Sequence, residues 1–65
     1  MKYVYFILKG NNGKQMFNRK DAEVAAKYFE GELYRLSYGY YQDCHGVFDA
    51  PTIRQIAEKI NINNK

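Results

Sequence analysis

A chain of 65 residues with a single cysteine holds at most one small domain and cannot form an intrachain disulfide. A hydrophobic share of 46% beside 26% charged residues is typical of a folded domain and argues against disorder. The longest apolar run, residues 3–8, is too short for a membrane span or a secretory signal, and a lone free cysteine suits a reducing compartment. We therefore expect a cytoplasmic protein without a membrane partner.

Charge is unevenly distributed along the chain. Residues 1–20 carry five basic side chains and no acid, whereas residues 21–32 carry four acids and one lysine. The remaining residues are close to neutral, and the net charge of the whole chain is +3. An asymmetry of this kind bears on the choice and steering of partners rather than on the fold.

Residues 2–17 predict a β-hairpin. Residues 2–9 are β-branched and aromatic and are apolar on both faces, which is typical of a central strand. Asn12-Gly13 is a signal for a tight turn because both residues tolerate positive φ, so residues 14–17 are expected to return as a short strand. The two faces of the first strand are Val4, Phe6 and Leu8 on one side, and Tyr3, Tyr5 and Ile7 on the other.

A first helix is predicted between Asn18 and Gly31. The side chain of Asn18 can accept from the first backbone N–H groups, and Asp21 suits the positive end of the helix dipole. Gly31 is typical of the residue that ends a helix. Helical spacing assigns to the sheet a narrow face made of Ala22, Ala25, Ala26 and Phe29.

Residues 32–41 predict a strand that carries a row of tyrosines. Seven tyrosines exceed what a core of this size holds, so part of the row is predicted to be a contact surface. Because Tyr3 and Tyr5 share a face of their own strand, we expect the aromatic surface to extend over two strands. With a strand's period of two, the face of the row consists of Tyr34, Leu36, Tyr38 and Tyr40.

The C-terminal third predicts a turn, a short strand and a second helix. Residues 42–46 are turn-like, residues 47–48 are expected to form a short partner strand, and Pro51 then introduces the helix. Residues 61–65 are expected to form a polar tail after a single domain over residues 1–60. The apolar face of the second helix consists of Ile53, Ile56, Ala57 and Ile60.

The start of this second helix has two alternatives. Thr52 and Gln55 match a capping box, in which the two side chains satisfy each other's backbone N–H groups. Asp49 or Ala50 can equally serve as the cap, which would place Pro51 in the first turn.

Together these elements predict an α+β fold in the order β-β-α-β-(β)-α, with two helices packed on a small, mostly antiparallel sheet of three or four strands. Two arrangements stay open. Both helices can cover the Val4 face of the first strand, which leaves the Tyr3 face free. Alternatively, the second helix crosses to the other face and its isoleucines cover part of the tyrosines.

The sequence offers little catalytic or metal-binding chemistry. Cys44 and His45 are the one plausible catalytic pair, but neighbours in an extended segment point to opposite sides and cannot easily share a proton. Together with Asp43 and Asp49 they match no known metal-ligand spacing, and a polar turn is the better interpretation. We therefore predict a non-enzymatic protein with no catalytic residue, no metal and no cofactor.

Binding is the function that remains, and two features indicate it. The basic hairpin can neutralise phosphates while tyrosine rings stack on unpaired bases. Tyrosine and arginine are also the residue types enriched at protein interfaces. The candidate binding residues are Tyr3, Tyr5, Lys9, Lys14, Arg19, Arg35, Tyr38, Tyr40 and Tyr41.

In size and element order, though in no diagnostic motif, the chain resembles the small proteins with which bacteriophages and mobile elements inhibit host machinery, such as anti-CRISPR proteins and polymerase inhibitors. The resemblance implies an inhibitor that binds a host protein or nucleoprotein complex in the host cytoplasm, and it transfers no residue roles. The alternative is a small nucleic-acid-binding protein that uses the basic hairpin and tyrosine stacking. A homodimer that buries the tyrosine face is a further alternative.

Overall fold

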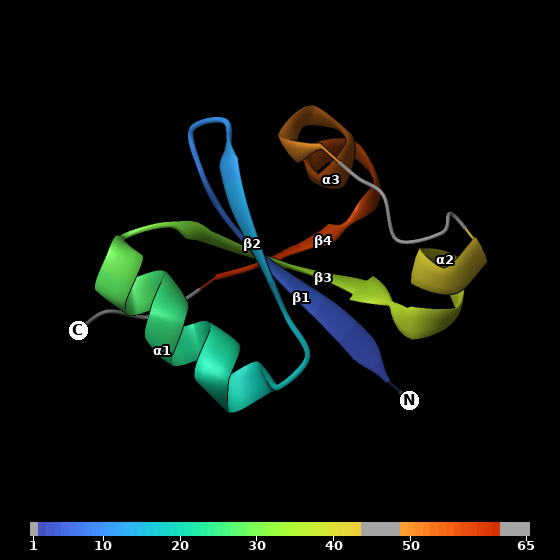
Figure 1. Ribbon diagram of the computed structural model, residues 1–65, viewed down its shortest axis with the longest axis horizontal. Coiled ribbons are helices and arrows are strands. Elements are labelled where there is room, and N and C mark those ends of the chain that lie inside the picture. The colour runs from blue at the N-terminus through green and yellow to red at the C-terminus, as the bar shows by residue number, and fades with distance from the viewer. Residues whose placement is uncertain (1, 44–48, 62–65) are drawn as a thin grey trace.

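The computed structural model describes residues 2–43 and 49–61, which form an antiparallel sheet with α1 on one side and α2 and α3 on the other (Figure 1). The strands lie in the order β2-β1-β3-β4, and every neighbouring pair is antiparallel. The predicted α+β class is therefore confirmed. In chain order the elements are β1 (Tyr3–Lys9), β2 (Asn12–Met16), α1 (Arg19–Phe29), β3 (Glu32–Ser37), α2 (Tyr38–Asp43), α3 (Ala50–Ile56) and β4 (Glu58–Ile60).

The hairpin turn lies two residues earlier than predicted. Lys9 pairs with Asn12, so Gly10 and Asn11 form the turn, and Gly10 supplies the positive φ of +61° that it needs. Asn12 and Gly13 belong to β2 instead. A side chain at Gly13 would begin 3.0 Å from Leu8 Cδ2, so this glycine leaves room for the buried Leu8 side chain.

The first helix begins as predicted but ends differently. The N–H of Asp21 donates to Asn18 Oδ1 at 3.1 Å, which confirms Asn18 as the N-cap. The left-handed residue at the other end is Glu30, with φ of 57°, and not Gly31. Gly31 is needed for another reason, because its backbone lies directly against Ile7 and Leu8 of β1.

The tyrosine strand is shorter than predicted, which breaks the row of rings. β3 ends at Ser37 and α2 starts at Tyr38. The hydroxyl of Ser37 accepts from the N–H of Tyr40 at 3.3 Å, and the N–H of Tyr38 donates to the carbonyl of Lys2 at 3.0 Å. These bonds satisfy the first turn of α2, so Tyr38 and Tyr40 leave the sheet instead of continuing the face of Tyr34.

The sheet separates two apolar cores, so the helices lie on opposite faces as in the second expected arrangement, but with the two faces exchanged. α1 covers the Tyr5 and Ile7 face, whereas α3 covers the opposite face. Phe6 pairs with Tyr34 and Tyr5 pairs with Arg35, so the tyrosines of β1 and β3 lie on opposite faces and form no common surface. Tyr34 and Leu36, two members of the face that the homodimer alternative would bury, are already buried within the chain.

After α3 the described structure has a fourth strand where the sequence predicted more helix. α3 stops at Ile56, and β4 pairs with β3 through Ile60 and Leu33. Ile60 thereby reaches the core under α1, which a continuing helix on the other face could not do. At the start of α3 the N–H of Thr52 donates to Asp49 Oδ1 at 3.0 Å, which settles the cap in favour of Asp49. The predicted strand at residues 47–48 lies outside the described residues.

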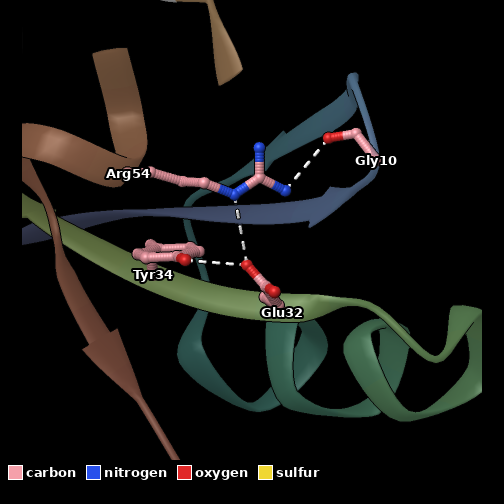
Figure 2. Close-up of polar contacts among 4 residues, drawn as sticks. All are labelled: Gly10, Glu32, Tyr34 and Arg54. Atoms are coloured by element: carbon pink, nitrogen blue, oxygen red, sulfur yellow. Dashed lines mark hydrogen bonds and ion pairs between the residues drawn. The ribbon is translucent and has the colours of Figure 1, made fainter. Parts of the chain in front are cut away.

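A polar cluster fastens α3 to the sheet and to the hairpin (Figure 2). Arg54 Nε donates to Glu32 Oε1 at 3.3 Å, and Arg54 Nη2 donates to the carbonyl of Gly10 at 3.0 Å. The hydroxyl of Tyr34 donates to the same Glu32 oxygen at 2.7 Å. One guanidinium thus joins the third helix, the β1–β2 turn and, through Glu32, strand β3.

We expect Glu32→Gln to lower the free energy of unfolding by about 1 kcal/mol near neutral pH, because two charge-assisted hydrogen bonds weaken. The Tyr34 hydroxyl, followed by Arg54, holds the pKa of Glu32 below its usual value. The contribution is therefore complete above the ordinary glutamate pKa and is lost as the pH falls through the lower, folded-state pKa. Urea unfolding of both proteins from neutral to acidic pH should show the difference shrink. If the difference in free energy of unfolding stayed constant down to acidic pH, the ionised Glu32 carboxylate would not be its source.

Candidate functional site

An open cavity forms where β1 extends beyond its neighbour β2. In the described structure the pairing of β1 with β2 stops at Tyr5 and Met16, and the chain then leaves the sheet to start α1. The space beside the first residues of β1 has a volume of about 490 Å³. We call it the aromatic–basic pocket, and it is lined by Lys2, Tyr3, Tyr5, Phe17, Asn18, Arg19 and Tyr38.

Two of the rings that line the pocket rest on a third. Tyr38 stacks on Tyr41 with 5.9 Å between ring centroids and 24° between planes, and Phe17 meets Tyr41 edge-on at 6.2 Å. The hydroxyl of Tyr41 accepts from Gln15 Nε2 at 2.5 Å, which ties that ring to β2. Phe17 still has 60% of its surface exposed. Tyr41 therefore supports the wall while Phe17 presents a large apolar face to solvent.

Arg35 holds the ring of Tyr3 from the neighbouring strand. Its guanidinium carbon lies 4.5 Å from the centroid of the ring, within the range of a cation–π contact. Arg35 Nε also donates to Glu58 Oε1 at 2.7 Å, and this hydrogen bond raises the pKa of Arg35. Arg35 is thus fixed behind Tyr3 by β4 and helps to orient the pocket without lining it.

The charges at the pocket are positive. Lys2 and Arg19 are its charged lining residues, and no carboxylate lines it among the described residues. Arg19 Nε lies 2.9 Å from Glu23 Oε2 one turn along α1, and this hydrogen bond raises the pKa of Arg19. Both side chains of that pair are about half exposed, with 49% and 40% of their surfaces accessible. Exposed pairs of this kind contribute little free energy, so Glu23 can be displaced at low cost.

Comparisons with protein-family models, with curated proteins and with solved structures found no match.

The predicted binding residues do not form one surface. Tyr3, Tyr5, Arg19 and Tyr38 meet in the pocket, while Arg35 and Tyr41 lie directly behind its rings. Tyr40 is 47% exposed on α2 but does not line the pocket. The expected grouping of Lys9 and Lys14 with Tyr3 and Tyr5 is wrong.

Lys9 and Lys14 lie at the other end of the hairpin because of its register. Lys14 pairs with Ile7 and Lys9 pairs with Asn12, next to the turn. Both lysines line a separate, mostly apolar cavity of about 260 Å³ together with Phe29. Lys14 Nζ lies 5.6 Å from the centroid of the Phe29 ring, so this lysine has an aromatic partner within the chain.

Three lining residues were missed from the sequence: Lys2, Phe17 and Asn18. Phe17 directly precedes the N-cap, a position where an apolar residue commonly packs on the first turns of its helix. The residue that it would meet there, Ala22, has almost no side chain, and Phe17 stays exposed. A signal in the sequence could have indicated this exposure: an aromatic residue stands before the N-cap, and the residue four positions into the helix is too small to cover it.

The predicted polar turn with Cys44 and His45 lies outside the described residues. Across residues 2–43 and 49–61, no three or more histidine, cysteine, aspartate or glutamate side chains group in a way that could hold a metal ion. The helices in the same ranges are all too short or too polar to cross a membrane.

Proposed function

We propose that this chain is a non-enzymatic binding protein that contacts a protein partner through the aromatic–basic pocket. The observation that carries the proposal is an exposed Phe17 beside Tyr3 and Tyr38, whose rings are already held by Arg35 and Tyr41. Aromatic and arginine side chains dominate the binding energy of protein interfaces. Rings that are fixed before binding lose little conformational freedom when a partner arrives.

The dispersal of the basic side chains favours a protein partner over a nucleic acid. Each arginine has a carboxylate within the chain: Glu23 for Arg19, Glu58 for Arg35 and Glu32 for Arg54. A nucleic acid is bound most tightly by several cations that lie together on one surface. Here Lys2 and Arg19 line the aromatic–basic pocket, whereas Lys9 and Lys14 line the separate cavity at the other end of the hairpin.

The narrower proposal is an inhibitor of the kind that phages and mobile elements encode, acting in the host cytoplasm on a host protein or nucleoprotein complex. Its support is the small size of the chain and its β-β-α-β beginning. A protein of this kind needs a rigid contact surface and no catalytic group.

Capture from a bacterial lysate tests the proposal. The immobilised protein should retain a defined partner, detected by mass spectrometry, and Phe17→Ser should reduce its recovery about tenfold or more. The matched control is Tyr28→Ser, since Tyr28 is 79% exposed on the outer face of α1 and does not line the pocket. Circular dichroism should show that both variants fold. A partner retained equally by Phe17→Ser and the unchanged protein would refute the assignment of the pocket.

A salt titration with single-stranded DNA and RNA tests the alternative. We expect no binding at micromolar concentration, because the basic side chains are divided between the two ends of the hairpin instead of lying on one surface. Micromolar binding that weakens steeply with salt would instead favour a nucleic-acid-binding function.

A further inference from the structure

Resting on the proposed function, we propose that the aromatic–basic pocket receives an acidic segment of the partner. A carboxylate would lie between Lys2 and Arg19, and an apolar neighbour in the same segment would pack on Phe17. The cavity of about 490 Å³ has the size of sites that bury a small ligand, which is enough for two or three side chains.

Charge complementarity carries the first part of the inference. Lys2 and Arg19 line the pocket, and no acid lines it among the described residues. Arg19 has one ion-pair partner in the described structure, Glu23, which lies one turn along α1 and is itself exposed. A carboxylate from a partner can replace Glu23 on Arg19 while also meeting Lys2, which at present makes no ion pair within the described structure.

The aromatic wall carries the second part. Phe17 offers an exposed apolar surface in the lining of the pocket. The ring centroids of Tyr3 and Tyr5, which also line it, lie 6.4 Å apart. Because Tyr38 is stacked and Tyr3 is held by Arg35, the walls need little reorganisation to accept a side chain. A segment that alternates acidic and apolar residues satisfies both the cations and the rings.

The test is an amide chemical-shift titration of the full ¹⁵N-labelled chain. The probe is an end-blocked peptide of alternating glutamate and leucine, and the matched control peptide has glutamine in place of glutamate. At about 1 mM the acidic peptide should shift the amide signals of residues 2–3, 17–19 and 38. The amide signals of Lys9 and Lys14 should stay unchanged. The glutamine peptide should bind about tenfold more weakly.

Charge variants sharpen the test. Arg19→Gln should weaken binding of the acidic peptide about fivefold or more, whereas Lys14→Gln, which removes the same charge at the other end of the hairpin, should leave it unchanged. Glu23→Gln releases Arg19 and should tighten binding about twofold to fivefold. A merely structural role for Arg19 would not produce opposite effects from Arg19→Gln and Glu23→Gln.

The outcomes separate this inference from the proposed function. Equal chemical-shift changes with both peptides, or none with either, would overturn the proposal that the pocket receives an acidic segment. Capture of a partner that depends on Phe17 would in that case still support a protein-binding pocket. Loss of the Phe17 dependence refutes the pocket itself. Stronger shifts at the same residues with single-stranded DNA overturn the inference in favour of an anionic nucleic-acid ligand.

Discussion

Shortening Leu33 to alanine is expected to lower the free energy of unfolding by about 2–5 kcal/mol. Leu33 is fully buried in the core between the sheet and α1, where it packs with Ile7 and Ala26. A domain of this size has a total stability of roughly 3–10 kcal/mol, so the variant should lose a large fraction of it. Urea denaturation followed by circular dichroism measures the loss.

Leu8→Ala provides the matching result for the opposite core. Leu8 is equally inaccessible, but it lies under α3 on the other face of the sheet. Comparable losses from the two variants would show that both layers are needed for folding. The control is Val24→Ala on the outer face of α1, where 67% of the residue's surface is exposed, and its change should stay within about 0.5 kcal/mol. If Leu33→Ala lowered the free energy of unfolding no more than Val24→Ala, the two-core arrangement would be contradicted.

Gly31→Ala should lower the free energy of unfolding by about 1–3 kcal/mol, which is the largest effect that we expect outside the two leucine truncations. A Cβ at this position would lie 2.9 Å from Ile7 Cγ2 and 3.0 Å from the carbonyl oxygen of Leu8. The carbonyl belongs to β1 in the centre of the sheet, so it cannot move away without disturbing strand pairing. Thermal unfolding of the variant should show a lower midpoint without a change in binding at the pocket.

Two other glycines provide controls for this prediction. Gly39 lies in α2 with no atom within 4 Å of the added Cβ, so Gly39→Ala should be neutral or stabilise by up to about 1 kcal/mol. Gly10 also has free space, but its φ of +61° makes Gly10→Ala strained by about 1–2 kcal/mol. If Gly31→Ala changed the stability as little as Gly39→Ala, steric crowding at Gly31 would be ruled out.

Features that depend on neighbours in sequence were predicted well. The N-cap at Asn18 was assigned correctly, and Asp49 was one of two open alternatives, because a side-chain acceptor and the first N–H groups of a helix lie within three residues of each other. The alanine face of α1 likewise follows from helical spacing, and Ala22 and Ala26 are buried as expected. Phe29, which was assigned to the same face, is instead 43% exposed and lies beside Lys14.

The candidate site was predicted only in part, because it depends on where elements stop. Tyr38 appeared to extend a strand by its alternation with Leu36, but the hydroxyl of Ser37 and the carbonyl of Lys2 satisfy the start of a helix there instead. Phe17 carried no periodic signal, since it lies in the connection between β2 and α1. Hydrophobic periodicity and secondary-structure propensity do not encode where such elements end. Those ends are decided by hydrogen bonds between distant segments.

The sequence by itself determined the class of this protein: a small α+β domain with a basic first third, a capped alanine-faced helix and more tyrosines than its core needs. Only the tertiary structure decided which aromatic and basic residues meet. The antiparallel register of β1 with β3 placed Tyr5 opposite Arg35 and Phe6 opposite Tyr34, which sent the tyrosines of the two strands to different faces. Because a shift of one residue exchanges the faces of a strand, no local pattern could fix that outcome.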